Sequence, residues 1–304
     1  MPEGRSRTLL WILVGGGAFF LFVLAVFSLV YLTLHAGGNE TSLSSSFGDK
    51  IGVVDLDGVI LSPQPVVGQL KKFADDSSIK AIILHINSPG GGVAASEEIY
   101  REVLRIRDVK KKRIVASIET VGASGAYYVS SATNKIFADQ ASIVGSIGVI
   151  AEWYNYEELI KWAKLKAIVL KAGEFKDTGS PVREMTPAES AYLQGLIDNM
   201  HVQFIHSVAQ GRHMTDAQIQ PLADGKVWTG EQAIPLKLID QLGDFRAAVE
   251  DTAKSVGIKG EPTIVRPEKD RKSVLDLLFG DASEYLPDAA RLMQNNAEFY
   301  YLWK

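Results

Sequence analysis

The chain is organised around the stretch Thr120-Val-Gly-Ala-Ser-Gly-Ala-Tyr-Tyr128. The β-branched run Arg113–Ile118 before it predicts a strand, and the small and aromatic residues that follow predict a helix. Ser124 is therefore expected at a strand-to-helix turn between Gly122 and Gly125, which let the backbone turn sharply and let a substrate approach. The free N–H groups and the dipole at the start of such a helix would face a developing negative charge. This pattern suits a nucleophile, although small residues at a helix start also serve close packing.

Apolar runs alternate with amphipathic segments from about residue 50 onward. We expect strands at 51–56, 80–87, 113–119, 135–138, 143–150 and 167–171, and helices at 63–74, 97–107, 126–132, 156–164, 187–210, 215–222 and 230–236. The run Lys80–Asn87 is almost wholly apolar, as in a parallel strand buried on both faces. Thr186, Pro187 and Glu189 form a capping-box pattern at the start of a long helix. Together these patterns predict an α/β fold with a mostly parallel sheet flanked by helices.

The first part of the chain predicts a membrane anchor. Residues 9–34 contain no charged side chain, and these 26 residues would make a helix of about 39 Å, enough to span a bilayer. A cleavable signal peptide has a shorter apolar core, and Thr33–Ala36 is a poor cleavage site, so we expect the segment to be retained. Arg5 and Arg7 precede the span, whereas the next Lys or Arg after it is Lys50. The positive-inside rule then leaves the N-terminus in the cytoplasm and the rest outside.

Composition divides the chain into five parts. We expect a short cytoplasmic N-terminus at 1–8, the transmembrane helix at 9–34, a flexible Gly/Asn/Ser-rich tether at 35–49, a folded domain at 50–255 and a C-terminal extension at 256–304. The extension ends in the aromatic run Phe299-Tyr-Tyr-Leu-Trp303. That run could pack on a neighbour, lie at a membrane surface or stay loose.

Several classes of site are excluded by composition. The net charge of −4 gives no overall attraction to nucleic acid, and we interpret the basic run Lys110–Arg113 as a solvated loop. The absence of Cys excludes disulfides, thiolate metal sites and a Cys nucleophile. His201 and His206 are five residues apart, which does not match the spacing of a helical zinc site, and no H-E-x-x-H motif occurs. We therefore expect neither a metal nor a cofactor.

A second glycine-rich stretch, Ser88-Pro-Gly-Gly-Gly92, follows the apolar strand Lys80–Asn87. Successive glycines let backbone N–H groups face a ligand, so the stretch could form an oxyanion hole. A phosphate cradle is disfavoured because neither the Walker motif nor G-x-G-x-x-G is completed. A purely structural turn remains an equal alternative on this motif alone.

A serine nucleophile needs a base, and no histidine falls between the second glycine-rich stretch and the long helix; His85 is expected to be a satisfied core residue. A lysine amine has an ordinary pKa near 10.4, so only about one in 2,500 is neutral at pH 7. Lowering that pKa by about three units takes about 4 kcal/mol, which burial can supply. Lys176 lies in the turn-rich loop Lys171–Pro181, where active-site groups commonly occur. On chemistry alone, a solvated lysine beside Asp177 is the simpler interpretation.

Four motifs then resemble a known family. Asn87–Gly92, Gly122–Tyr128, Gly145–Val149 and Gly173–Pro181 occur in the order and spacing of signal peptide peptidase A, short bacterial form. The resemblance covers about residues 50–255. It implies a Clp-protease/crotonase fold with a Ser/Lys dyad, in which Ser124 is the nucleophile and Lys176 is the general base. It also implies that Ser146 hydrogen-bonds this lysine and that Gly91 and Gly125 donate to the oxyanion, with Gly90 as a neighbour.

The resemblance further implies a membrane-anchored endopeptidase at the outer face of the bacterial cytoplasmic membrane. Its substrates would be cleaved signal peptides and other small apolar polypeptides, with small apolar side chains near the scissile bond. Its subunits would form a homo-oligomer in which adjacent copies supply Ser124 and Lys176, so the two would lie apart within one chain. Two alternatives stay open: a catalytically silent oligomeric scaffold, and an acyl-CoA hydratase or isomerase, which would need neither residue.

Overall fold

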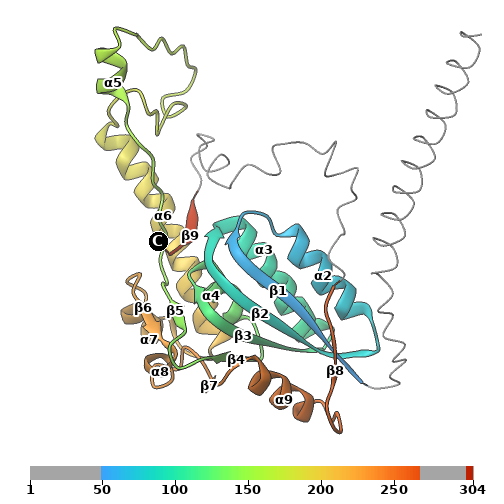
Figure 1. Ribbon diagram of the computed structural model, residues 1–304. Helices are drawn as coiled ribbons and strands as arrows, with labels where there is room; N and C mark the ends of the chain where they lie inside the picture. Colours follow the sequence, from blue (N-terminus) through green and yellow to red (C-terminus); the bar gives the residue numbers. More distant parts are fainter. Residues whose placement is uncertain (1–48, 268–298, 304) are drawn as a thin grey trace, which may run out of the picture. The chain divides into compact units, whose positions relative to one another are not determined.

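A sheet of nine strands forms the centre of the structure, a computed structural model that describes residues 49–267 and 299–303 (Figure 1). Its strands are β1 (Lys50–Ile60), β2 (Ile79–Gly92), β3 (Arg113–Ala123), β4 (Lys135–Ala138), β5 (Ile143–Gly145), β6 (Val227–Thr229), β7 (Gln241–Leu242), β8 (Thr263–Val265) and β9 (Tyr300–Leu302). The main order is β6-β5-β3-β2-β1-β8, with β4 pairing β3 and β7, and β9 pairing β2. Only β5–β6 and β2–β9 are antiparallel. The predicted mostly parallel sheet is therefore confirmed.

The helices connect and cover these strands. They are α2 (Gln64–Asp75), α3 (Val93–Leu104) with the π-helical turn η1 (Arg105–Val109), α4 (Gly125–Ser131), α5 (Glu157–Trp162), α6 (Pro187–Gly211), α7 (Asp216–Ile219) with the 3₁₀ turn η2 (Gln220–Leu222), α8 (Gly230–Ala233) and α9 (Phe245–Ser255). The capping box predicted at Thr186 is present, with the Thr186 side chain accepting from the Glu189 N–H. In Figure 1, α5 and the first half of α6 extend away from the sheet.

The two faces of the sheet bury different side chains. Val54 and Leu56 of β1 pack in the main core with residues of α2, α3, α4 and α6, whereas Ile51 and Val53 pack against α9. Successive side chains of a strand point to opposite faces, so a strand covered on both sides is apolar at nearly every position. This accounts for the continuous apolar run in β2.

Three strands, β1, β2 and β3, are longer than the sequence pattern predicts, the strand expected at 143–150 ends at Gly145, and the one expected at 167–171 is wrong. β2 continues through the glycines to Gly92, and β3 continues to Ala123, because both find partners there: Ser88 lies opposite Gly122 and Ala123 lies opposite Gly145. Residues 167–171 form no strand. Their apolar side chains face solvent, with Ile168 81% and Leu170 95% exposed, and no strand edge is paired with them.

Parts of the predicted organisation fall outside the described residues, among them the anchor at 9–34 and most of the tether at 35–49. Across residues 49–267 and 299–303, no helix combines the length and the apolar character needed to cross a membrane. β8 and β9 both belong to the expected C-terminal extension, and both pair with strands of the sheet.

Candidate active site

Ser124 occupies the junction between β3 and α4, where its backbone takes φ 53° and ψ −118°. A non-glycine residue held in such a sparsely populated region costs on the order of 1–3 kcal/mol and persists only when its surroundings hold it there. The Ser124 N–H donates to the Gly145 carbonyl at 2.7 Å, and its own carbonyl accepts from the Tyr128 N–H at 2.8 Å. Hydrolases use a strained strand-to-helix turn of this kind to present a nucleophilic serine. The predicted turn is therefore present.

Ser146 lies beside this turn and also has a positive φ. Ala123 and Gly145 are paired residues at the carboxyl ends of the parallel strands β3 and β5, so Ser124 and Ser146 each follow the last residue of neighbouring strands. Ser146 has φ 52°, is buried, and its N–H donates to the Lys226 carbonyl at 2.8 Å. The structure thus places two of the three residues that the resemblance assigns to catalysis at neighbouring strand ends.

The glycines of the expected oxyanion hole also lie together. A Cβ on Gly125 would lie 3.2 Å from the Gly91 N and 2.4 Å from the Ser96 Oγ, and a Cβ on Gly91 would lie 2.2 Å from the Ile60 carbonyl oxygen. Neither position has room for a side chain. Gly90 has φ 97°, and a Cβ there would lie 2.6 Å from the Gly125 N. The close approach of backbone amides from β2 and α4 is what an oxyanion hole requires.

Residues 299–303 lie along the same glycines as an extended strand. β9 runs antiparallel to the end of β2, with Gly91 opposite Tyr301; the Val93 N–H donates to the Phe299 carbonyl at 3.2 Å, and the Trp303 N–H donates to the Pro89 carbonyl at 2.8 Å. On the other edge, Tyr300 and Ile150 exchange two N–H···O bonds of 3.0 Å. None of the three states expected for the aromatic run describes this arrangement. The two edges form a slot that takes an extended peptide by strand addition.

Lys176 is not brought to this place within one chain. It lies on a turn of residues 151–186, here called the arm, where its backbone N–H donates to the Gly173 carbonyl at 3.3 Å. Its side chain is exposed and makes no hydrogen bond or ion pair with any of the described residues. Ser124, by contrast, is 1% exposed.

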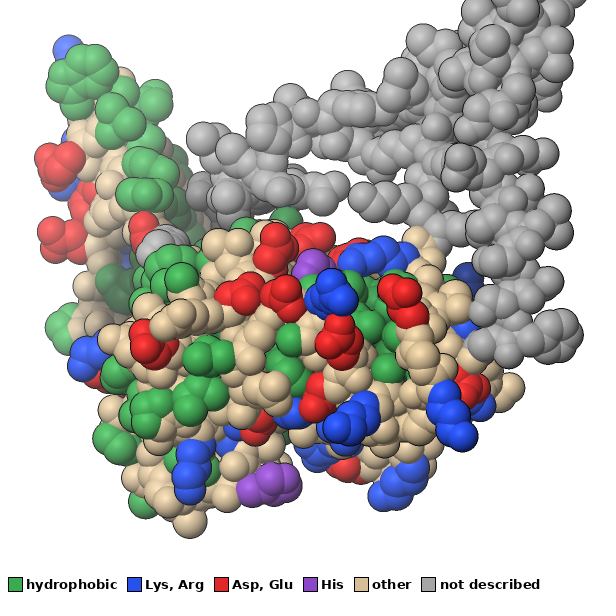
Figure 2. Space-filling model, turned by 60° about the horizontal axis from the view of Figure 1, so that its bottom comes forward, with side chains coloured by type: hydrophobic (Ala, Val, Ile, Leu, Met, Phe, Trp, Pro, Cys, Tyr) green, Lys and Arg blue, Asp and Glu red, His purple; other side chains and the backbone are tan. Residues whose placement is uncertain are grey.

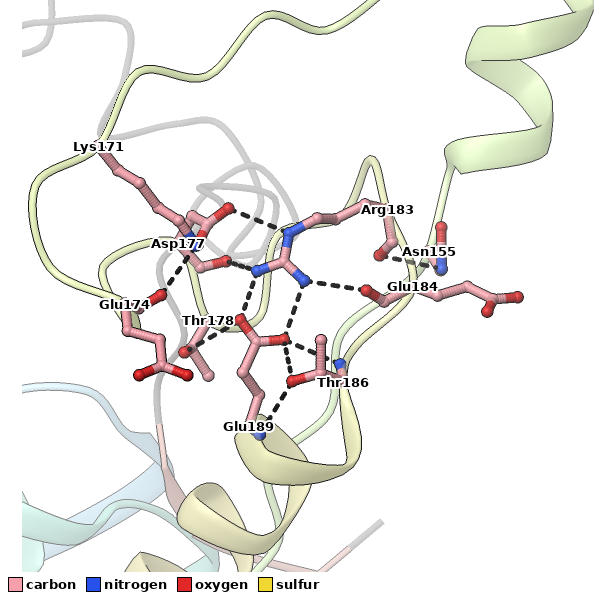
Figure 3. A network of polar contacts seen from close by, with 9 residues as sticks. All are labelled: Asn155, Lys171, Glu174, Asp177, Thr178, Arg183, Glu184, Thr186 and Glu189. Atoms are coloured by element: carbon pink, nitrogen blue, oxygen red, sulfur yellow. Dashed lines mark hydrogen bonds and ion pairs between the residues drawn. The ribbon is translucent and has the colours of Figure 1, made fainter.

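The loop that carries Lys176 is tied down by Arg183 (Figure 3). The guanidinium bridges two carboxylates: its Nε donates to the Asp177 Oδ2 at 3.0 Å, and its Nη1 donates to the Glu189 Oε2 at 2.9 Å. Lys171 pairs with the other oxygen of Asp177. Arg183, together with the Thr186 N–H, lowers the pKa of the Glu189 carboxyl to about 2, and Arg183 and Lys171 hold the pKa of Asp177 well below its usual range. An ionic network therefore joins this loop to the start of α6.

Apolar side chains cover much of the arm. Tyr154, Leu159, Trp162, Leu165, Ile168, Val169 and Leu170 are all more than half exposed. Figure 2 shows hydrophobic side chains gathered along the segment at its upper left. An exposed apolar surface of this kind is typical of an interaction site.

Sequence reasoning missed two features of the site. The pairing of β9 with β2 was not anticipated, although the concentration of aromatic residues at 299–303 was a signal of burial. Arg183 was also missed, because its two partners lie six residues away on either side in a turn-rich loop. Within the described part of the chain, no group of three or more His, Asp or Glu side chains could hold a metal ion. The strained serine, the clustered amides and the slot together suit attack on a carbonyl of an extended chain.

Comparison with known proteins gives a family for this arrangement. Residues 107–259, which include Ser124, Ser146 and Lys176, match peptidase family S49. A candidate protease of Methanocaldococcus jannaschii is 35% identical over 213 residues, which are 70% of this chain and 68% of that protein. A candidate signal peptide peptidase of Enterococcus faecium is 35% identical over 63% of this chain and 55% of its own length. Protease 4 of Haemophilus influenzae is 31% identical over 71% of this chain and 36% of its own length.

Proposed function

Because the chain belongs to peptidase family S49 and is a serine-type peptidase, we propose that it is a membrane-anchored endopeptidase acting on cleaved signal peptides and other small apolar polypeptides. The observation that carries the proposal is the slot beside Ser124. A strand of peptide lies there against the glycines of β2, with its Tyr301 carbonyl oxygen 3.1 Å from where a Cβ of Gly125 would be. A site that holds an extended chain by its backbone suits polypeptides of varied sequence.

The reaction uses Ser124 as nucleophile and Lys176 as base. The Ser124 Oγ attacks the carbonyl carbon of the peptide bond while the neutral Lys176 amine accepts the hydroxyl proton. The N–H groups of Gly91 and Gly125 stabilise the resulting oxyanion. The C–N bond then breaks, and the leaving amine takes the proton from Lys176. A water molecule gives a proton to Lys176 and attacks the ester carbonyl. The bond to the Ser124 Oγ then breaks, which releases the new carboxyl end, and Lys176 returns its proton to the Ser124 Oγ.

The two catalytic side chains come from adjacent copies of the chain in this proposal. Ser124 is buried beside the sheet, whereas Lys176 is exposed on the arm and free of ion pairs with other described residues. The exposed apolar side chains of the arm supply a surface that a second copy would cover. Ser146 would then hydrogen-bond the incoming amine, and burial at the subunit contact would favour its neutral form.

The finer fold and the location are part of the same proposal. In the mostly parallel sheet, β2 ends in glycines, and β3 is followed by a serine at the start of the short helix α4. This arrangement suits the Clp-protease/crotonase fold. Residues 9–34 would anchor the chain in the bacterial cytoplasmic membrane, with the N-terminus inside and the catalytic domain outside. The substrates would then be peptides present in or at that membrane.

The test compares peptide turnover and labelling by a serine-directed fluorophosphonate in the full-length chain and its variants. Ser124→Ala should lower turnover by at least about 10⁴-fold and abolish labelling, and Lys176→Ala should lower turnover by about 10²- to 10⁴-fold. The matched controls are Ser131→Ala, a buried serine of α4 that bonds the Tyr128 carbonyl, and Lys166→Ala, an exposed lysine of the arm. Both should keep normal turnover.

Each rival function gives a different result in this test. A silent scaffold would neither turn over peptide nor take the label in the wild-type chain. An acyl-CoA hydratase or isomerase would turn over acyl-CoA and be insensitive to both substitutions. Full peptide turnover in either Ser124→Ala or Lys176→Ala would overturn the proposed dyad.

A further inference from the structure

The outer end of the arm carries charges of one sign. We call residues 161–171, Lys161-Trp-Ala-Lys-Leu-Lys-Ala-Ile-Val-Leu-Lys171, the tip. The tip contains four lysines and no acidic residue, and every one of its residues is exposed. The side chains of Lys164 and Lys166 make no ion pair with any of the described residues. The tip therefore presents positive charge that the rest of the described chain does not neutralise.

The same residues expose large apolar side chains. Trp162 and Ile168 are both 81% exposed, and Leu170 is 95% exposed. The first half of α6 carries this part of the arm away from the sheet (Figure 1), and hydrophobic side chains gather along the segment in Figure 2. Because removing such side chains from water is favourable, a cluster of them on an exposed segment indicates a binding surface.

The charge of the tip separates a lipid partner from a protein partner. Lysine is depleted at protein–protein interfaces, whereas lysine combined with tryptophan and leucine is typical of elements that lie at a membrane surface. The neighbouring part of the arm differs, because residues 151–160 contain three glutamates and no lysine or arginine. The second copy of the proposed function would pack on that part, around Tyr154 and Leu159, which leaves the tip for a different partner.

We propose that the tip binds the surface of an anionic lipid bilayer. Its lysines would lie at the lipid phosphates, and Trp162, Ile168 and Leu170 would enter the boundary between headgroups and acyl chains. Residues 163–171 form neither helix nor strand, and such a backbone needs water for its polar groups, so the tip would stop at this boundary. The proposal rests on the proposed membrane location and adds a second contact with that membrane. It would hold the loop of Lys176 where apolar peptides gather.

A fluorescent label tests the lipid contact in the full-length chain. The chain has no Cys, so a single introduced Cys takes a unique label. Leu170→Cys is labelled with a nitrobenzoxadiazole dye and reconstituted in vesicles of phosphatidylglycerol and phosphatidylcholine. Lipids with a nitroxide near the headgroup should quench the dye at least about twofold, because an interfacial element lies about 5–10 Å into this boundary. The matched control is Val202→Cys, an exposed apolar position of α6 outside the arm, which should not be quenched.

Charge substitutions in the labelled chain test the preference for anionic lipid. Lys164→Gln with Lys166→Gln removes two charges from the tip. Each lysine near an anionic surface strengthens binding about fivefold, so the ratio of bound to free tip should fall about 25-fold. Lys254→Gln with Lys259→Gln removes two exposed lysines outside the arm and should leave quenching unchanged. Equal quenching in the two double variants would overturn the choice of an anionic lipid.

The remaining outcomes separate the tip from the anchor and from catalysis. Absence of lipid quenching at Leu170→Cys, in a chain that stays with the vesicles through an alkaline wash, would overturn the proposal. A blue-shifted dye without lipid quenching would overturn it too, because a second copy would then cover the tip. Quenching in a chain that the alkaline wash releases would refute the anchor and support the tip contact. Peptide turnover enters none of these measurements, so failure of the proposed peptidase would not change them.

Discussion

Ser124 is held by backbone hydrogen bonds and is 1% exposed, whereas Lys176 stands on an arm whose apolar side chains face solvent. Around Ser124, three strand ends and a helix start meet, and glycines allow close approach of backbone to backbone. On the arm, the loop is instead held by the charges of Arg183, Asp177 and Glu189. The sheet thus holds Ser124 in place, whereas Lys176 lies on a loop that is held by ion pairs between side chains.

The difference indicates what each half still needs. We call the part of the site around Ser124 the serine half. It already contains the backbone amides and the slot, so it lacks only a base. The arm offers an amine on an exposed side chain, so it lacks a serine and an oxyanion site within reach. Placing the arm of one copy over the slot of another would supply the base and would also bury the exposed apolar side chains.

Substitution of Gly90 tests the serine half without changing either residue of the proposed dyad, and should lower turnover more than substitutions in the arm. In Gly90→Ala the new Cβ would lie 2.6 Å from the Gly125 N and 3.0 Å from the Ala123 carbonyl oxygen, at a backbone φ of 97°. Because the methyl group would fill the space for the oxyanion, kcat/KM should fall by at least about 10²-fold, as when one oxyanion donor is lost. Peptide turnover measures this, with circular dichroism as a check on folding.

Gly92→Ala is the matched control in the same stretch. A Cβ on Gly92 would meet nothing closer than the Ile60 carbonyl oxygen at 3.6 Å, and Gly92 has φ −56°. Turnover in Gly92→Ala should stay within about threefold of wild type, because the new methyl group would cause neither a clash nor backbone strain. Similar activities of the two variants would mean that Gly90 does not border the oxyanion.

The serine half was largely predictable from the sequence because its rules are local. A β-branched run before small residues predicted the turn at Ser124, and the structure places β3 and α4 on either side of it. Thr120 to Ala123 were missed as strand because their pairing depends on β5, which lies beyond the turn. The glycines of β2 were not expected to be strand because their pairs, with the end of β1 and with β9, depend on distant parts of the chain.

The arm and the aromatic run were less predictable because long-range contacts decide them. Ile168 and Val169 have the propensity for a strand, but propensity does not form a strand without a neighbouring edge. Residues 299–303 pair with a strand about 210 residues earlier, and no local pattern specifies that register. The roles of Ser124 and Lys176 stay predictions until they are tested by substitution.

Mixing two inactive variants tests whether the halves come from different copies. Ser124→Ala and Lys176→Ala carry opposite defects, so a site built from the Ser124 of one copy and the Lys176 of the next would be intact in some mixed assemblies. With equal amounts and random assembly, turnover should recover to about a quarter of wild type. The two variants are co-expressed with different affinity tags, and mixed assemblies are purified through both. Doubly tagged wild type is the control, and a mixed assembly without activity would place both residues in one copy.

The smallest effect is expected from loosening the arm. Arg183→Gln removes the partner of Asp177 and of Glu189, whose side chain is only 5% exposed. The loop would lose the ionic part of its connection to α6, so Lys176 would spend less time in a productive position. We expect turnover to fall by about threefold to tenfold, because misplacing a catalytic group lowers the rate without removing the group. Amide hydrogen exchange at residues 176–189 should rise in this variant. Arg246→Gln, which breaks a fully exposed pair with Glu250, should change neither measurement.

The pH dependence of hydrogen exchange in the same loop checks independently that ion pairs hold the loop in place. The Glu189 carboxyl has a pKa of about 2 in the folded chain against an ordinary value of 4.5, so its contribution to stability is complete above about pH 4.5. As the pH falls from there through about 2, protonation removes that contribution. Exchange at residues 176–189, corrected for intrinsic rates, should therefore stay constant from pH 7 to 5 and increase below about pH 4. In Arg183→Gln the carboxyl no longer has its cation, so exchange should be faster already at pH 7 and its increase should begin at higher pH. If wild type and Arg183→Gln gave the same profile, hydrogen bonds of the backbone rather than charge would hold the loop, and the contrast between the two halves of the site would be lost.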